Sequence, residues 1–252
     1  MTDRARSGGF RTTADRAGHL RRPFMSIAIA AVVGAAAPNG GDATVVDIDG
    51  VRSVLIRVEH PRGSLVILPG GDGILNVAPD GGFTGNVTNV LVRNRAAFAA
   101  RGFDVLLVEN GTDLAAAVRF MAAMRKPVTV VATSAGTQRA ARGIAAGARP
   151  DRLVLTSGFL TTQSGPGDSV AAILGSPSRL PPTLIIHHRQ DHCRFTRPAG
   201  VMSFLAWSGG RADAVWLAGG TEGDNPCRFD AHHGFAGRDD ALVSRIVRFA
   251  GR

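Results

Sequence analysis

The sequence contains no tyrosine and only one lysine, Lys126, so its formal net charge of +9 comes almost entirely from arginine. The arginines are scattered along the chain and are not interleaved with aromatic residues, which make up 6% of the sequence. Domains that bind nucleic acids usually gather basic residues into a patch and add aromatic side chains that stack on bases. The composition therefore argues against a nucleic-acid partner and favours an arginine-rich surface, which can still attract acidic substrates.

Cysteine is also scarce: the chain has two, Cys193 and Cys227, and no Cys-x-x-Cys or His-Glu-x-x-His motif. Zinc sites usually take ligands from such closely spaced pairs. His187 and His188 are adjacent in a predicted strand, so their side chains point to opposite faces and could not share one ion. Other possible ligands lack the spacing: Asp191, His192, Cys193, Cys227, His232 and His233. We therefore expect no metal site.

The N-terminal region has no apolar run of the roughly 20 residues that a bilayer-spanning helix needs. Residues 26–37 form a shorter apolar segment, of the length typical of a signal peptide. The preceding run Leu20-Arg21-Arg22-Pro23-Phe24-Met25 resembles a twin-arginine export signal, with leucine where serine or threonine is usual. We predict that residues 1–37 direct export to the periplasm or medium, with cleavage near Ala36 or Ala43. A disordered, unprocessed extension or a start at Met25 is the alternative, and either would leave the protein in the cytoplasm.

A serine lies where a predicted strand meets a predicted helix. Residues 128–131, Val-Thr-Val-Val, are typical of a buried strand, and residues 137–146 are typical of a helix. Ser134 between them is flanked by small residues, which a sharp strand-to-helix turn requires because the backbone segments approach closely. The pattern matches the G-x-S-x-G nucleophile elbow, with Ala132 in place of the first glycine. The alternative is a serine that only caps the helix.

An aspartate and a histidine follow two later predicted strands, in the order that a Ser-Asp-His triad on this kind of scaffold needs. With Ser134 in its elbow, Asp191 after the strand 183–188 and His233 in a His-Gly-Phe sequence, the chain resembles the α/β-hydrolase superfamily over about residues 44–251. The resemblance implies that these three are the nucleophile, the acid and the base. His232 is the rival to His233, and a turn-forming role is the alternative for Asp191.

The resemblance also implies an oxyanion hole made of backbone N–H groups. One donor is expected at Ala135, after the nucleophile, and the other at Gly71 or Asp72, in the glycine-rich loop 69–73 that follows the strand 64–68. The usual His-Gly start of this loop is replaced by Pro-Gly. A plain turn is the alternative, whereas a phosphate loop is disfavoured because Gly-Lys-Ser/Thr is missing.

The two cysteines lie close in sequence to the predicted acid and base. Cys193 follows Asp191 by two residues, and Cys227 precedes His233 by six. Because the two loops must meet if Asp191 is to reach His233, a Cys193–Cys227 disulfide would join them in an oxidising compartment. This arrangement also resembles a subset of small exported hydrolases. Two free, buried thiols are the alternative.

The remaining segments alternate between strand and helix, which predicts an α/β fold with a doubly wound, mostly parallel sheet. Its start is an antiparallel N-terminal hairpin turned at Asp49-Gly50. Predicted strands cover 44–48, 51–58, 64–68, 103–108, 128–131, 152–156, 183–188 and 214–218. Predicted helices cover 90–101, 113–124, 137–146, 170–174, 201–207 and 240–249. Residues 44–252 are expected to form one domain of the α/β-hydrolase fold, with a minimal lid or none because the insert 158–180 is short.

These predictions converge on a serine hydrolase that cleaves an ester or related small acyl compound through an acyl-enzyme, without a cofactor. The candidate residues all follow carboxyl ends of strands, where ligands bind in such sheets. Specificity is expected in the loops 71–90 and 158–182. An acyltransferase and a non-catalytic binding relative of the fold are the alternatives, and a metallohydrolase is disfavoured by the ligand spacing.

Overall fold

The computed structural model describes residues 43–252. The predicted signal peptide 1–37, including the twin-arginine-like run, Met25 and the cleavage position at Ala36, lies outside the described residues. The strands are β1 (Ala43–Ile48), β2 (Val51–Ile56), β3 (Gly63–Leu68), β4 (Phe103–Leu107), β5 (Val128–Thr133), β6 (Arg152–Thr156), β7 (Thr183–His188) and β8 (Ala212–Leu217). The helices are α1 (Val90–Arg93), α2 (Arg95–Ala100), α3 (Leu114–Met124), α4 (Ala135–Ala145), α5 (Val170–Leu174), α6 (Ala199–Trp207) and α7 (Asp239–Ala250), with short 3-10 turns η1 (Pro177–Arg179) and η2 (His232–Gly234).

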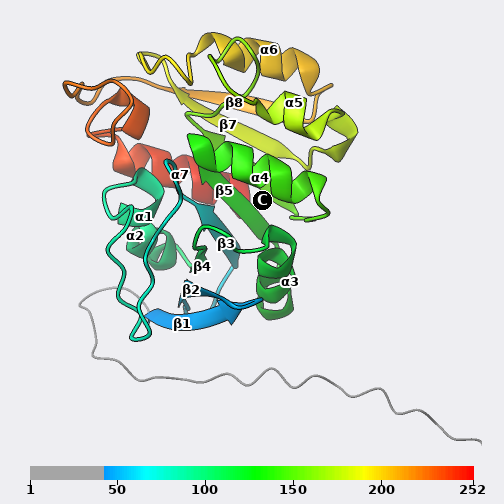
Figure 1. The fold of residues 1–252 in the computed structure, drawn as a ribbon, viewed down its shortest axis with the longest axis vertical. Helices are drawn as coiled ribbons and strands as arrows, with labels where there is room; N and C mark the ends of the chain where they lie inside the picture. The colour runs from blue at the N-terminus through cyan, green and yellow to red at the C-terminus, as the bar shows by residue number, and fades with distance from the viewer. Residues whose placement is uncertain (1–42) are drawn as a thin grey trace, which may run out of the picture. The chain divides into compact units, whose positions relative to one another are not determined.

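The eight strands form one mixed sheet in the order β1-β2-β4-β3-β5-β6-β7-β8 (Figure 1). β2 runs antiparallel to both of its neighbours, β1 and β4, and every other pairing is parallel. The β1–β2 hairpin turns at Asp49 (φ 51°) and Gly50 (φ 85°), the pair of positive φ angles that a tight two-residue turn needs. The predicted doubly wound sheet with an antiparallel N-terminal hairpin is confirmed.

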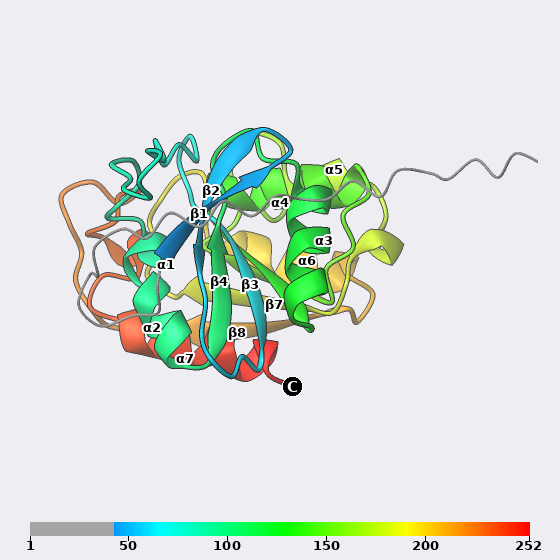
Figure 2. The ribbon, with the colours of Figure 1, turned by 90° about the horizontal axis from the view of Figure 1, so that it is seen from below.

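Helices cover both faces of the sheet because alternate residues of each buried strand point to opposite sides (Figure 2). In β3, Val66 and Leu68 pack in a cluster with residues of α3, α4, α5 and α6. Leu65 and Ile67 pack in a second cluster with residues of α1, α2 and α7. Both faces of the sheet are therefore largely apolar, and Ser134 and Asp191 follow the carboxyl ends of β5 and β7.

The predicted helix 90–101 is wrong in one respect, because it is broken at Asn94 into α1 and α2. The Asn94 side chain donates to the carbonyl of Val90 (2.8 Å) and to the carboxylate of Asp239 at the start of α7. Asparagine side chains compete with the helical backbone for such hydrogen bonds. The break therefore results from a contact with a distant helix, which local helix propensity does not contain.

The segment between β6 and β7 contains only α5 and η1 as helical structure. α5 packs against α4, and at Gly165 the segment lies so close to the backbone of Arg194 that a side chain there would overlap it. The insert thus packs on the loop after β7 and forms no separate helical lid. Within residues 43–252, no helix is both long and apolar enough to cross a bilayer.

Candidate active site

Ser134 lies between the end of β5 and the start of α4, in a backbone conformation that non-glycine residues rarely adopt (φ 51°, ψ −127°). The surrounding backbone holds it there: its N–H donates to the carbonyl of Thr156 (3.0 Å), and its carbonyl accepts from the N–H and hydroxyl of Thr137 (2.9 and 2.6 Å). The Ser134 side chain makes no capping hydrogen bond to the helix. The turn therefore presents the hydroxyl instead of using it as a helix cap.

The small residues around Ser134 are required by close packing. A Cβ at Gly136 would overlap the carbonyl oxygens of Leu68 and Pro69, so α4 can approach the end of β3 only with glycine there. Ala132, which replaces the first glycine of the usual pattern, is fully buried in β5. The elbow thus tolerates alanine at its first small position and requires glycine at its last.

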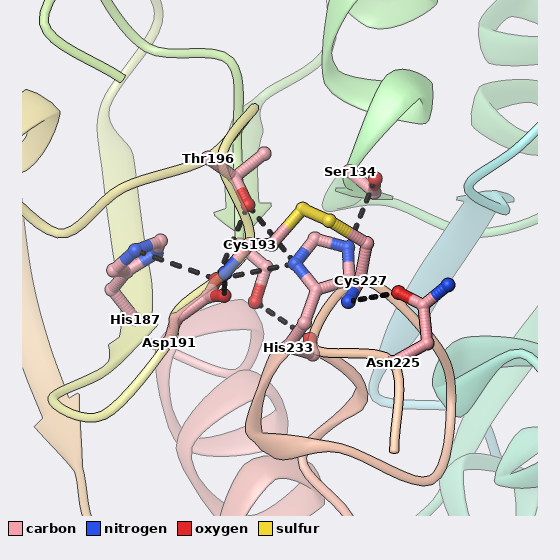
Figure 3. The surroundings of a disulfide bond; sticks show 9 residues. Ser134, His187, Asp191, Cys193, Thr196, Asn225, Cys227 and His233 are labelled. Carbon is pink, nitrogen blue, oxygen red and sulfur yellow. Dashed lines mark hydrogen bonds and ion pairs between the residues drawn. A yellow bond between two sulfur atoms is a disulfide. The ribbon is translucent and has the colours of Figure 1, made fainter. Parts of the chain in front are cut away.

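The structure brings Ser134, His233 and Asp191 into one hydrogen-bonded line (Figure 3). His233 Nε2 is 3.1 Å from Ser134 Oγ, and His233 Nδ1 is 3.1 Å from Asp191 Oδ2. Asp191 is 2% exposed and His233 is 7% exposed, whereas Ser134 is half-buried. His232 points elsewhere: its ring stacks on that of His188, and its Nδ1 pairs with Glu222. The geometry thus distinguishes between the two adjacent histidines.

Two further side chains hold this line, and sequence reasoning missed both. The Thr196 hydroxyl donates to Asp191 Oδ2 (3.2 Å) and lies 3.0 Å from His233 Nδ1, and the backbone N–H of Cys193 donates to Asp191 Oδ1 (2.9 Å). The Ser157 hydroxyl donates to the His233 carbonyl (2.8 Å) from the end of β6. Neither residue belongs to a motif or a periodic pattern, so nothing in the sequence alone would have marked it.

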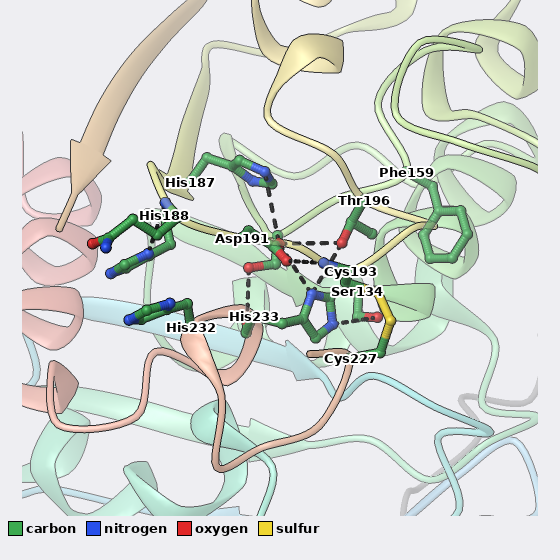
Figure 4. Close-up of polar contacts among 12 residues, drawn as sticks. Ser134, Phe159, His187, His188, Asp191, Cys193, Thr196, Cys227, His232 and His233 are labelled. Carbon is green, nitrogen blue, oxygen red and sulfur yellow. Dashed lines mark hydrogen bonds and ion pairs between the residues drawn. A yellow bond between two sulfur atoms is a disulfide. The ribbon is translucent and has the colours of Figure 1, made fainter. Parts of the chain in front are cut away.

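A second buried histidine lies beside the aspartate (Figure 4). His187 Nε2 is 3.7 Å from Asp191 Oδ2, and the His187 ring packs edge-on against Trp216. Burial lowers the pKa of His187 to about 4, an effect that the charge of Asp191 offsets only in part. His187 is therefore neutral at pH 7, and it leaves Asp191 to interact with His233.

The neighbouring His188 serves a different purpose. Its Nε2 donates to the carbonyl of Gly219 (2.8 Å) while its Nδ1 accepts from the N–H of Gln190 (3.1 Å), which defines one neutral tautomer. Burial lowers the pKa of His188 as well. In the described part of the chain, no group of three or more His, Cys, Asp or Glu side chains is arranged to hold a metal ion.

The predicted disulfide is present. Cys193 and Cys227 are bonded, with their Cα atoms 4.6 Å apart, and the bond joins the loop of Asp191 to the loop that leads to His233 (Figure 3). On the second loop, the N–H of Cys227 donates to the side chain of Asn225 (3.0 Å). The covalent link therefore acts directly beside the contact between Asp191 and His233.

The loop after β3 lies against the elbow, as its predicted role as oxyanion donor requires. A Cβ at Gly70 would be 3.0 Å from the Cβ of Ser134, and Gly71 has φ +58°. The side chain of Asp72 accepts from the N–H of Ile74 (3.0 Å) and faces into its own loop. The N–H groups of Gly71, Asp72 and Ala135 have no hydrogen-bond acceptor among residues 43–252. They are therefore available to a ligand oxygen near Ser134.

Two hollows lie outside the triad, and neither is lined by Ser134, Asp191 or His233. One, of about 300 Å³, lies beside the loop 69–73 and is lined by Pro69, Gly73, Glu109 and Arg139, among others. The other, more open and of about 380 Å³, is lined by Val87, Thr88, Phe229 and Asp230, among others. Val87 and Phe229 are exposed apolar side chains. Part of the loop 71–90, which the sequence suggested for specificity, thus contributes to the second hollow.

No protein-family model matches the sequence, and no curated protein is similar to it in sequence. In structure it is similar to an α/β serine hydrolase without a lid from Xanthomonas campestris, at 15% identity and a TM-score of 0.53, over 83% of this chain and 96% of that one. It is also similar to an esterase from Pyrococcus furiosus, at 13% identity and a TM-score of 0.59, over 86% of this chain and 94% of that one. A third similar structure is a bacterial brefeldin A esterase, at 15% identity and a TM-score of 0.56, over 88% of this chain and 80% of that one. This likeness establishes the α/β-hydrolase fold.

Proposed function

We propose that this chain, which has the α/β-hydrolase fold, is a serine hydrolase that cleaves an ester or related small acyl compound. The single observation that carries the proposal is the line from Ser134 Oγ through His233 to Asp191, with both contacts at 3.1 Å and the serine in a strained turn. Strained backbone persists only where the surrounding structure enforces it, and it is concentrated at functional sites. The esterases among the structural neighbours support the same chemistry.

In the proposed reaction, Ser134 Oγ attacks the acyl carbon and its proton passes to His233 Nε2. Asp191, held by Thr196 and the Cys193 N–H, keeps the imidazole oriented and stabilises its charged form. Collapse of the tetrahedral adduct breaks the bond to the leaving alcohol, which takes the proton from His233. Water then adds to the acyl-enzyme by the same route, which releases the acid and restores the serine hydroxyl.

We infer that the adduct's negative oxygen is bound by the N–H of Ala135 together with that of Gly71 or Asp72. These groups lie on the two segments that meet at the elbow, the start of α4 and the loop after β3. Ala135 begins α4, so the positive end of the helix dipole adds to its effect. The mechanism needs no cofactor.

The substrate is proposed to be a small acyl compound that reaches an open site. The short β6–β7 connection supports this, because it packs on the loop of Asp191 instead of forming a lid. The disulfide supports a working location in an oxidising compartment, in keeping with export.

The test is a comparison of Ser134→Ala with the exposed control Ser178→Ala. We expect Ser134→Ala to lower the turnover of p-nitrophenyl esters by at least about 10³-fold and to abolish labelling by a fluorophosphonate probe. Ser178→Ala should match the wild-type protein in both assays, and both variants should keep the wild-type circular dichroism spectrum. Undiminished turnover by Ser134→Ala, or a probe adduct on another residue, would overturn the proposal.

A further inference from the structure

Arg139 connects the helix that follows the nucleophile to the loop after β3. It lies one turn beyond Ala135 on α4, and its side chain crosses to the carbonyl side of that loop. Its Nη1 donates to the carbonyl of Gly71 (2.9 Å), and its Nη2 contacts the carbonyl of Pro69 and lies 3.5 Å from that of Gly70. Three successive carbonyl oxygens of one loop thus converge on a single guanidinium group.

This contact has a consequence for the N–H groups of the loop. In a trans peptide unit the C=O and N–H point in opposite directions. Arg139 contacts the carbonyl oxygens of residues 69–71, and each of these shares a peptide unit with the N–H of the next residue. The N–H groups of Gly70, Gly71 and Asp72 therefore face away from Arg139. Gly70 is also the point at which the loop touches Ser134. The arginine therefore determines which side of the loop offers donors at the elbow.

The loop is shaped around the guanidinium. A Cβ at Gly73 would lie 2.6 Å from Arg139 Cζ, so a side chain there would displace the guanidinium, and Gly73 has a positive φ (77°) that favours glycine. The N–H of Gly73 donates to the carbonyl of Gly70 (3.2 Å). Burial lowers the pKa of Arg139, and the charge of Asp72 partly offsets this. An arginine remains charged under these conditions, and its planar guanidinium holds its N–H donors in a fixed geometry, which the flexible ammonium of a lysine does not.

We propose that Arg139 is a positioning residue that orients the loop 69–73 so that its N–H groups complete the oxyanion hole. The inference rests on the proposed function, since it assigns a task within that reaction. Arg139 itself does not touch the reacting atoms. It acts through the peptide units that it holds, and it joins them to the helix that carries the other donor, Ala135.

The same helix offers a matched control. Arg142 lies one turn further along α4 and makes an exposed ion pair with Asp168 (3.0 Å). It donates to no carbonyl of the loop 69–73. Replacing Arg142 removes the same charge from the same helix without releasing the loop, so a comparison of the two arginines separates orientation of the loop from the general effect of positive charge.

The experiment measures kcat and KM on a p-nitrophenyl ester, and the inhibition constant of a trifluoromethyl ketone that forms an oxyanion adduct with the serine. Removal of one oxyanion donor typically costs about 10²–10³ in kcat, so we expect Arg139→Ala to lower kcat by roughly 10- to 100-fold. KM should stay within about threefold, and the ketone should bind more weakly by about the same factor as kcat falls. Arg139→Lys should be intermediate, and Arg142→Ala should match the wild type.

Chemical rescue gives a second readout that a purely structural role would not move. Guanidinium ion at a sub-denaturing concentration should raise the kcat of Arg139→Ala and leave that of Arg142→Ala unchanged. If Arg139→Ala does not fold, as judged by circular dichroism, the comparison passes to Arg139→Lys, which keeps the charge and the aliphatic stem.

The inference is overturned if the Arg139 variants that fold have the kcat and ketone affinity of Arg142→Ala, or if only KM changes. In that outcome the wild-type protein still labels at Ser134 and Ser134→Ala is still inactive, so the proposed function survives. If Ser134→Ala retains full activity instead, both the function and the inference fail.

Discussion

At the scale of single residues, four polar groups are directed at the carboxylate of Asp191. Oδ1 accepts from the Cys193 N–H, and Oδ2 faces the Thr196 hydroxyl, His233 and, at 3.7 Å, His187. Both oxygens of this buried carboxylate therefore have hydrogen-bond partners within the protein. His187 does not compete with His233 for an ion pair with Asp191 at pH 7, because burial keeps His187 uncharged.

His187 makes the stability of the protein depend on pH. In the unfolded chain it takes up a proton below a pKa of about 6.5, but in the folded protein only below about 4. Between these values the unfolded state holds more protons, so stability falls as the pH is lowered through this window and is fully present above it. The difference corresponds to about 3 kcal/mol. Between pH 7 and pH 4.5 the free energy of unfolding, measured with urea, should therefore fall less in His187→Asn than in the wild type. We expect the two decreases to differ by about 2–3 kcal/mol.

The control for this prediction is His60→Asn, because His60 has a side chain that is 90% exposed. Its unfolding free energy should follow the wild-type pH dependence. Other titrating groups affect all three proteins alike and cancel in the comparison. Parallel curves for the wild type and His187→Asn would show that the buried imidazole does not resist protonation.

At the scale of elements, one arginine ties α1 to the histidine loop and to α7. Arg93 donates to both carboxylate oxygens of Asp239 (2.7 and 3.1 Å) and to the carbonyls of Thr88, Phe229 and Gly234. These contacts use all five of its N–H groups. Burial by itself would raise the pKa of Asp239, but hydrogen bonds from Arg93 and Asn94 and the Arg93 charge lower it. The residue after His233, Gly234, is therefore held by a side chain of α1.

We predict that Arg93→Ala lowers the free energy of unfolding by about 2 kcal/mol, because it removes a bidentate ion pair and three hydrogen bonds to carbonyls. Chemical denaturation of Arg93→Ala, Asp239→Asn and the double variant would measure the coupling between the two side chains. The double variant should be less destabilised than the sum of the single changes. Arg101→Ala, which loses only a 3.4 Å contact with Ser244, should be close to the wild type. Strict additivity would contradict the prediction.

At the scale of the whole molecule, the disulfide links two loops near the C-terminal end of the chain. Cys193 and Cys227 are 34 residues apart, and α6 and β8 lie between them. A cross-link of this span lowers the entropy of the unfolded chain, which stabilises the folded state by about 4 kcal/mol in the loop-closure treatment. The bond therefore acts on global stability and, through its position, on the meeting of Asp191 with His233.

The predicted effect of removing the bond is a loss of about 3–4 kcal/mol in the double variant Cys193→Ala/Cys227→Ser, measured by urea unfolding without reductant. Ester turnover should fall as well, because the two loops are then joined only by non-covalent contacts. Adding dithiothreitol to the wild type should reproduce the loss, and adding it to the variant should change nothing. A variant as stable as the oxidised wild type would contradict the prediction.

The sequence alone determined the strands, most of the helices and their order, because these depend on local properties. Apolar and β-branched runs specify the buried strands, and Asp49-Gly50 specifies the hairpin turn. The small residues around Ser134 mark a turn whose backbone clashes with anything larger. Even the candidate acid and histidine could be found, since carboxyl ends of parallel strands meet at one edge.

Only the tertiary structure decided which polar groups pair. Each of these contacts joins residues distant in sequence. They include the contact of Ser134 with His233 and not with His232, and the hydrogen bonds of Thr196 and Ser157 to His233. The hydrogen bonds of Arg139 to the loop after β3 are of the same kind. The break at Asn94 has the same origin. A hydrogen bond depends on tenths of an ångström and on direction, and these are set by the packing of the whole sheet and its helices. Local sequence carries no such information.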